Sequence, residues 1–270
     1  MAGYRPRLHS RIYLSIICLF FISCEQELVF DNPLDQINNP DYIPPDTFIT
    51  VDELADSTIN NSSVTITWVG NDMVIEYATR HNEGEWSGWS ADTSLTLNYL
   101  DEGQHSFSVK GRYATLDEDP TPASVIFTVD NIHGPAIRVY KLMTEMSVDS
   151  TQDIHIYAEE VTGLVVARFQ VQYDPSLLDL DTESVLKGDL YSDIEEILFI
   201  VEEIGSGILD VNLSTLSHNG ISGTGALIKL PFTAVKAGSS DIEILNPQFR
   251  DINGDELEVN ASVNGMVIIQ

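Results

Sequence analysis

The segment RFQVQYDPSLLDL (residues 168–180) decides how the C-terminal half of the chain folds. Apolar residues alternate with polar ones along its first part, which is the pattern of a strand with one buried side and one outward side. The apolar set is Phe169, Val171 and Tyr173, and the polar set is Arg168, Gln170 and Gln172. Asp174-Pro175 then ends the strand, because proline has no backbone N–H to donate. The pattern predicts that the polar set faces outward and leaves open whether that side is only solvated or binds a partner.

The same alternation occurs in two later segments. ILDVNLST (residues 208–215) places Asp210 and Asn212 opposite to the predicted inward set Leu209, Val211 and Leu213. ALIKLPFTA (residues 226–234) places Lys229 opposite to the predicted inward set Ile228, Leu230 and Phe232. Side chains two residues apart share one side of a strand. We therefore predict that these three polar side chains point outward, either as a solvated sheet surface or as part of the same binding face as the polar set of residues 168–172.

The region from residue 47 to residue 131 consists of short predicted strands separated by turns. Their segments are VTITWVG (64–70), MVIEYATR (73–80), SLTLNYL (94–100), GQHSFSVKGRYA (103–114) and ASVIFTVD (123–130). This arrangement indicates a β-sandwich. The region resembles bacterial Ig-like or fibronectin type III-like modules, which mostly space and present other domains. Trp86 and Trp89 in GEWSGWS could stack on sugar rings or cap the sandwich beside a hairpin, and the loop resembles one that recurs in this type of module.

Residues 135–270 also have a β pattern, with no crossover helix long enough for a βαβ unit. The segments FQVQYDPSLLDL, VLKGDL, GALIKLPFTAVKAG and FRDINGDELEVNASVNGMVII, in this order, resemble a cohesin domain. Some cellulose-binding modules share parts of this fold. The resemblance implies a nine-stranded jelly roll, so the fold class is all-β with two β-sandwich domains in tandem.

The cohesin resemblance also implies a function, the binding of a dockerin, which is a small calcium-loaded helical module. In that family the strand with Tyr-Asp-Pro lies in the binding sheet, so the expected partner-binding residues are Arg168, Gln170, Gln172, Asp210, Asn212 and Lys229. Val166 and Arg168 stand where cellulosomal cohesins often carry acidic or amide groups. The partner therefore need not be a cellulosomal dockerin.

Two segments of this half have ambiguous local patterns. LYSDIEEILFIVEE (residues 190–203) has apolar residues near helical spacing and could hold a short helix before a strand ILFIV. DINGDELEVNAS (residues 251–262) resembles a calcium loop, but its glycine is at the fourth position and its twelfth residue is Ser262 rather than glutamate. We predict a strand-joining turn there and no metal site.

The N-terminus resembles a bacterial lipoprotein signal. Three arginines precede the apolar run IYLSIICLFFI (residues 12–22), which is shorter than the about 20 residues that span a bilayer. The run ends in Ser23-Cys24, although Phe21 stands where leucine is usual. The resemblance implies cleavage before Cys24 and acylation of this cysteine, which anchors the protein to a membrane. Residues 1–23 are then the signal peptide, and the proline- and asparagine-rich residues 24–46 an extended tether.

The charge of the chain limits the classes of partner that it can bind. The sequence has 42 acidic and 13 basic residues and a formal net charge of −29, which makes nucleic acid a poor partner. The histidines are scattered without metal-ligand spacing, and the chain has neither a phosphate loop nor a nucleophile elbow. We therefore expect no enzyme and no cofactor. The sequence favours an exported, lipid-anchored scaffold or adaptor at the cell surface that binds a protein partner; a carbohydrate-binding surface lipoprotein of polysaccharide utilisation and a purely structural surface protein are the alternatives.

Overall fold

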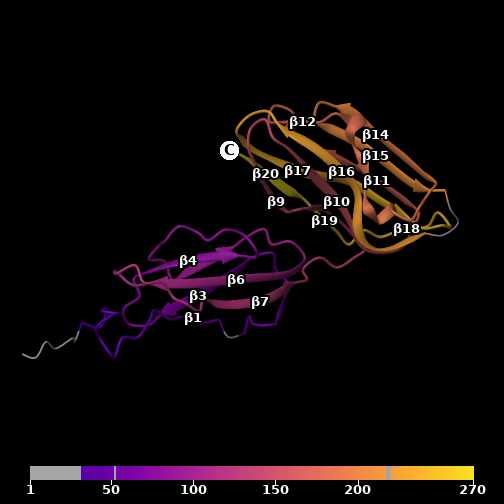
Figure 1. The fold of residues 1–270 in the computed structure, drawn as a ribbon. Helices are drawn as coiled ribbons and strands as arrows, with labels where there is room; N and C mark the ends of the chain where they lie inside the picture. The colour runs from indigo at the N-terminus through magenta and orange to yellow at the C-terminus, as the bar shows by residue number, and fades with distance from the viewer. Residues whose placement is uncertain (1–31, 52, 217–219) are drawn as a thin grey trace, which may run out of the picture. The chain divides into compact units, whose positions relative to one another are not determined.

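The computed structural model describes residues 32–51, 53–216 and 220–270 (Figure 1). Within these ranges the chain is all-β, with two short 3-10 helices and no α-helix, which confirms the predicted fold class. No helix among the described residues is long and apolar enough to cross a bilayer. The predicted signal peptide and Cys24 lie outside the described residues.

The chain divides into two compact units between Ile43 and Pro44. The described part of the predicted tether that precedes this boundary contains successive turns rather than one extended run. The carboxylate of Asp35, for example, accepts hydrogen bonds from the backbone N–H groups of Ile37 and Asn38 at 3.1 and 3.0 Å. Short Asp and Asn side chains stabilise turns in this way, so the composition that excludes helix also favours local turns.

Seven strands make up the β-rich segment from Thr47 to Val129. They are β1 (Thr47–Ile49), β2 (Thr58–Ile59), β3 (Val64–Gly70), β4 (Glu76–His81), β5 (Ser94–Leu97), β6 (Gly103–Arg112) and β7 (Ala123–Val129). One sheet has the order β1-β3-β5 and the other β2-β7-β6-β4. Trp68 and Phe107, one from each sheet, are buried with ring centroids 5.7 Å apart, so the two sheets share one apolar core.

Cationic side chains surround the two tryptophans of the GEWSGWS loop. The guanidinium of Arg80 lies 4.7 Å from the Trp86 ring centroid, and that of Arg112 lies 4.3 Å from Trp89. The ammonium of Lys110 is 4.9 Å from the first ring and 5.3 Å from the second. Such cation–π contacts are worth about 0.5–1 kcal/mol each at exposed sites. Because two cations lie over each of these rings, the arrangement favours a structural cap over a sugar-stacking platform.

The C-terminal β region forms two larger sheets. Its elements are β8 (Ala136–Tyr140), β9 (Met143–Met146), β10 (Thr151–Leu164), β11 (Val166–Gln172), β12 (Leu178–Asp179), η1 (Thr182–Ser184), β13 (Leu186–Lys187), η2 (Asp189–Tyr191), β14 (Ile197–Gly205), β15 (Ile208–Thr215), β16 (Ile221–Ala234), β17 (Gly238–Arg250), β18 (Glu256–Leu257), β19 (Ala261–Val263) and β20 (Gly265–Ile269). The front sheet has the order β14-β15-β11-β17-β20-β9, and the back sheet β12-β16-β10-β8-β19. Two short strands extend them, because β18 pairs with β17 and β13 pairs with β16.

The core of this region lies between the front and back sheets. Phe169 of β11 and Phe232 of β16 are both fully buried, as is Ile156 of β10. The edge of the Tyr173 ring meets Phe232 at a centroid distance of 4.8 Å. The predicted inward sets of all three alternating segments are therefore confirmed: none of these side chains is more than 7% exposed.

The Tyr-Asp-Pro segment is held by the turn between β14 and β15. The backbone N–H of Tyr173 donates to the carbonyl of Gly207 at 2.9 Å. Gly207 has a φ of +72°, and a Cβ atom there would lie 2.3 Å from the Tyr173 carbonyl oxygen. Only glycine fits this position, because it tolerates positive φ and lets two backbones approach closely.

The segment 190–203 contains the predicted strand but not the α-helix that its spacing allowed. A 3-10 helix, η2, ends at the fully buried Tyr191, and β14 follows from Ile197. Ile197, Phe199 and Val201 pack against the core with a period of two, since β14 pairs antiparallel with β15. Pairing with a neighbouring strand has overridden the local helical spacing.

The segment that resembles a calcium loop is a turn, as predicted. Asp251 donates its backbone N–H to the carbonyl of Asp255 at 2.9 Å, and β18 then pairs back onto β17. The guanidinium of Arg250 donates to the carbonyl of Gly254 at 2.8 Å. Within the described residues, no group of three or more His, Cys, Asp or Glu side chains is placed to hold a metal ion.

The back sheet contains a buried ion pair. Arg138 on β8 and Glu159 on β10 are 3% and 8% exposed, and Arg138 Nε donates to Glu159 Oε2 at 2.6 Å. The other carboxylate oxygen accepts from the Thr224 hydroxyl at 2.8 Å. The guanidinium also lies 4.9 Å from the centroid of the Tyr157 ring. Buried charges of this kind are tolerated because they are paired and hydrogen-bonded.

Candidate protein-binding face

The front face, defined as the outward side chains of β14, β15, β11 and β17, combines most of the polar residues that the sequence predicts to point outward. In the register of β11 and β15, Arg168 lies opposite Asn212 and Gln170 opposite Asp210. On the other side of β11, Arg168 lies opposite Gln248 of β17. Directly opposed residues of antiparallel strands have Cβ atoms about 4.5–5.5 Å apart, so these side chains are placed to contact one another.

A hydrogen-bonded polar cluster occupies the centre of the front face. Asp210 Oδ1 accepts from Gln170 Nε2 at 3.3 Å, and Asp210 Oδ2 accepts from Asn212 Nδ2 at 2.8 Å. Arg168 Nη2 lies 3.5 Å from the same Asp210 Oδ2. Gln170 in turn accepts from Asn246 Nδ2 at 3.1 Å, so the cluster extends from β15 across β11 to β17.

Asp210 is the charged centre of this polar cluster. Its side chain is 14% exposed, whereas that of Arg168 is 56% exposed. Burial raises the pKa of Asp210, but the hydrogen bonds from Asn212 and Gln170, together with the charge of Arg168, outweigh burial and place the pKa below its ordinary value. The carboxylate is therefore ionised and held in place, while the guanidinium keeps most of its surface free to contact a partner.

The outer edge of the front face is apolar. Leu198 and Ile200 on β14, the edge strand of the sheet, are 46% and 38% exposed, and Ile200 lies opposite Asn212. Beside the polar cluster there is a shallow depression of about 230 Å³, lined by Arg168, Gln170, Asp210, Asn246 and Gln248. An apolar strip beside fixed donors and acceptors is the composition of many protein-binding surfaces.

Lys229 does not belong to the front face, which corrects the sequence prediction that grouped it with the other five residues. It points outward from β16, and β16 lies in the back sheet between β12 and β10. Lys229 is paired with His155 of β10. Alternation along one strand determines which side of that strand is buried, but it carries no information about which of two sheets the strand joins.

The other five predicted residues all lie on the front face, but only four of them belong to the polar cluster. Arg168, Gln170, Asp210 and Asn212 form the polar cluster, whereas the exposed Gln172 lies opposite Glu243, outside the cluster. The sequence did not predict the outward side chains of β14. The apolar residues of that segment are also near helical spacing, so the pattern does not distinguish a strand from a helix there. It does not reveal Asn246 either, which has a positive φ of 52° at the irregularity in the β11–β17 pairing. Asn246 is followed by Pro247, and a proline within a strand indicates such an irregularity because it cannot donate a backbone hydrogen bond.

Comparison with known families identifies the C-terminal region, and solved structures of cohesins are similar to it. The family model described as Cohesin domain matches residues 142–269. A non-cellulosomal cohesin from the hyperthermophilic archaeon Archaeoglobus fulgidus is 23% identical over 50% of this chain and 90% of its own, with a TM-score of 0.42. The comparison with curated proteins gave no match.

Two further solved structures are cohesins crystallised with dockerins. The sixth cohesin of Acetivibrio cellulolyticus scaffoldin B, in complex with a mutant Cel5 dockerin, is 20% identical over 51% of this chain and 100% of its own, with a TM-score of 0.43. The Coh-OlpA–Doc918 complex from Clostridium thermocellum gives 18% identity over 50% of this chain and 99% of the other, also with a TM-score of 0.43. With the family match and the two packed sheets, the predicted resemblance is confirmed: residues 142–269 of this chain form a cohesin domain.

Proposed function

We propose that this protein is a membrane-anchored adaptor whose cohesin domain binds a dockerin-type protein through the front face. The polar cluster centred on Asp210, beside the apolar strip of Leu198 and Ile200, is the observation that carries the proposal. Membership of the cohesin family supports a dockerin-type partner, and the apolar strip suits the aliphatic side chains of a helix. The remainder of the chain then acts as a spacer. The protein as a whole has a non-catalytic role.

The composition of the front face favours a protein over a polysaccharide. Among the described residues, the outward positions of its four strands carry aliphatic, hydroxyl, amide and charged side chains and no aromatic ring. The phenylalanines Phe169, Phe199 and Phe249 belong to the inward set. Polysaccharide sites need aromatic faces on which sugar rings stack. Arg168 and Asp210 instead offer charge-assisted hydrogen bonds, which are stronger than neutral ones.

The test is a titration of the full chain with a panel of dockerin modules, in calcium and again in EGTA. At least one dockerin should bind in calcium and lose binding in EGTA, because dockerins fold around calcium. Arg168→Glu should weaken that binding about tenfold or more, since reversing an interfacial charge slows association and breaks a paired contact. Lys229→Glu is the matched control: it makes the same change of charge on the back sheet and should leave the affinity unchanged.

The proposal fails if none of the dockerins binds. It also fails if the two charge reversals weaken binding equally, because binding would then depend on net charge rather than on the front face.

The membrane anchor is a second part of the proposed function and rests on the sequence of residues 12–24. Acylated Cys24 would hold the protein in the cell envelope, with residues 24–46 and the β-rich segment that follows as a spacer. Cys24→Ala should move the protein from the membrane fraction to the soluble fraction after a high-salt wash, and Cys18→Ala should not. A Cys24→Ala variant that stays with the washed membranes contradicts the lipid anchor.

A further inference from the structure

A second recess lies away from the front face, where the chain passes from the back sheet to the front sheet. It follows β8 through the crossover into β9 and includes the first residues of β10. Its volume is about 420 Å³, and its lining includes Tyr140, Lys141, Glu145, Gln152, Asp153 and His155. Small-molecule sites usually measure about 300–1,000 Å³. We call this recess the crossover pocket.

Aromatic rings form one wall of the crossover pocket. Tyr140 of β8 and His155 of β10 are paired residues on adjacent strands, with ring centroids 6.4 Å apart. Tyr157, two residues further along β10, does not line the pocket, but its ring centroid lies 4.9 Å from that of Tyr140, and its ring is nearly parallel to that of His155, at an interplanar angle of 11°. All three side chains are partly buried, so the contacts with Tyr157 limit the rotation of the two rings that form the wall.

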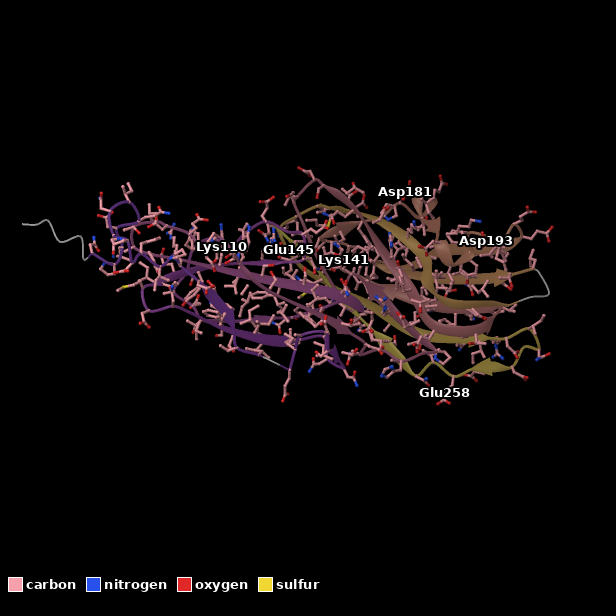
Figure 2. All side chains as sticks on the ribbon, turned by 60° about the horizontal axis from the view of Figure 1, so that its bottom comes forward. Lys110, Lys141, Glu145, Asp181, Asp193 and Glu258 are labelled. Atoms are coloured by element: carbon pink, nitrogen blue, oxygen red, sulfur yellow. The ribbon has the colours of Figure 1, made fainter. Side chains whose placement is uncertain are left out.

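Polar groups of both hydrogen-bonding types also line the crossover pocket. Lys141 and Glu145, labelled close together in Figure 2, supply an ammonium donor and a carboxylate acceptor. Asp153 adds a second exposed carboxylate. Gln152 Nε2 donates to the backbone carbonyl of Glu145 at 3.2 Å, which links β10 to β9 across the pocket. The amide oxygen of Gln152 keeps its acceptor capacity.

The charge of the crossover pocket disfavours an anionic ligand. Two carboxylates, Glu145 and Asp153, face one ammonium, Lys141, and the whole chain has a net charge of −29. Burial, followed by the positive charge of the paired Lys229, lowers the pKa of His155, so its imidazole is neutral at neutral pH and offers one donor and one acceptor. The four polar side chains around the recess also disfavour a purely apolar ligand.

From this combination we infer that the crossover pocket binds a neutral saccharide. One cation, the Arg138 guanidinium, lies 5.3 Å from the Tyr140 ring centroid and covers part of this ring. The remaining surface of the Tyr140 ring stacks on the C–H face of one sugar ring, because aromatic faces carry negative charge density that attracts polarised C–H groups. Lys141, Glu145, Gln152 and Asp153 exchange hydrogen bonds with the sugar hydroxyls. This site is separate from the front face, so the adaptor would hold a protein partner and a glycan at the same time.

The test is calorimetric titration of the full chain with soluble β-1,4-linked hexasaccharides of glucose, xylose and mannose, and with hexagalacturonate as the anionic comparison. At least one neutral hexasaccharide should bind, and hexagalacturonate should not. Asp153→Ala, a change at an exposed position that should leave the fold intact, should weaken binding at least tenfold. Tyr140→Ala should do the same, whereas Tyr140→Phe, which keeps the ring, should stay within about threefold of the wild type.

Two control variants show whether saccharide binding occurs in the crossover pocket itself. Asp241→Ala removes an exposed carboxylate of β17, outside the crossover pocket, and should leave saccharide binding unchanged. Arg168→Glu should also leave saccharide binding unchanged. A failure of saccharide binding can therefore be distinguished from a failure of protein binding at the front face. The inference is overturned if no neutral hexasaccharide binds, if hexagalacturonate binds equally well, or if Asp153→Ala binds like the wild type.

Discussion

At the scale of single residues, Asp210 determines how the front face responds to pH. Its pKa is below the ordinary value because Asn212, Gln170 and Arg168 favour the ionised carboxylate more strongly than burial opposes it. A carboxyl group with a lowered pKa in the folded state stabilises that state above its unfolded pKa of about 3.9. The stabilisation is lost as the pH falls through the folded pKa, when the carboxylate takes up a proton.

Asp210→Asn should therefore reduce the free energy of unfolding by a constant amount at neutral pH, and the difference from the wild type should shrink below about pH 4. Urea unfolding between pH 2.5 and pH 7 measures this difference. Asp241→Asn is the control for removing one negative charge from a very acidic chain. If both variants follow the same pH dependence, the lowered pKa of Asp210 has no part in stability.

At the scale of elements, the pairing of β8 with β10 depends on how its buried charges are compensated. Arg138 has its guanidinium between Glu159 and the tyrosine rings of the same sheet, and it is 3% exposed. Removing one partner of a buried ion pair leaves the other charge without compensation, which costs about 3–5 kcal/mol. Replacing both partners with apolar side chains is often far less costly.

We expect Glu159→Ala to lower the stability of the cohesin domain by about 3–5 kcal/mol, and the double change Arg138→Met with Glu159→Leu to be less destabilising than the single one. Differential scanning calorimetry of the full chain compares the variants, with Glu256→Ala as an exposed control on β18. A loss below about 1 kcal/mol for Glu159→Ala would show that the guanidinium finds another partner or solvent.

At the scale of the whole molecule, the chain has two separate apolar cores. One cluster of buried residues lies between Leu54 and Val129, and the other between Ile137 and Ile269. Among the residues that the structure describes, all strand pairings also stay on one side or the other of residues 130–135. A region with its own core and its own closed set of strand pairs has the requirements for independent folding.

The boundary between residues 131 and 135 that the sequence predicts agrees with this separation and stays a prediction, which expression of residues 135–270 alone tests. The fragment should be soluble, show a β-type circular dichroism spectrum with little helical signal, and melt in one cooperative transition. That transition should lie within a few degrees of the cohesin transition of the full chain. An unfolded fragment would mean that the first β-rich segment supplies part of the cohesin fold.

Sequence patterns were enough to predict the all-β fold class and the buried sides of β11, β15 and β16. The inward positions of β11, β15 and β16 and the turn after Arg250 follow from short-range patterns, because side-chain direction along a strand has a period of two. These features depend on neighbours within a few residues.

Which outward residues share a surface depends on how the strands are ordered in the folded protein. Lys229 and Arg168 have the same pattern in sequence, yet one lies on the back sheet and the other on the front sheet. Asn246 reaches Gln170, which is 76 residues away in the chain, through an irregularity in the β11–β17 pairing. The physical reason is that strand order and register arise from long-range packing of the core, which short-range alternation does not contain.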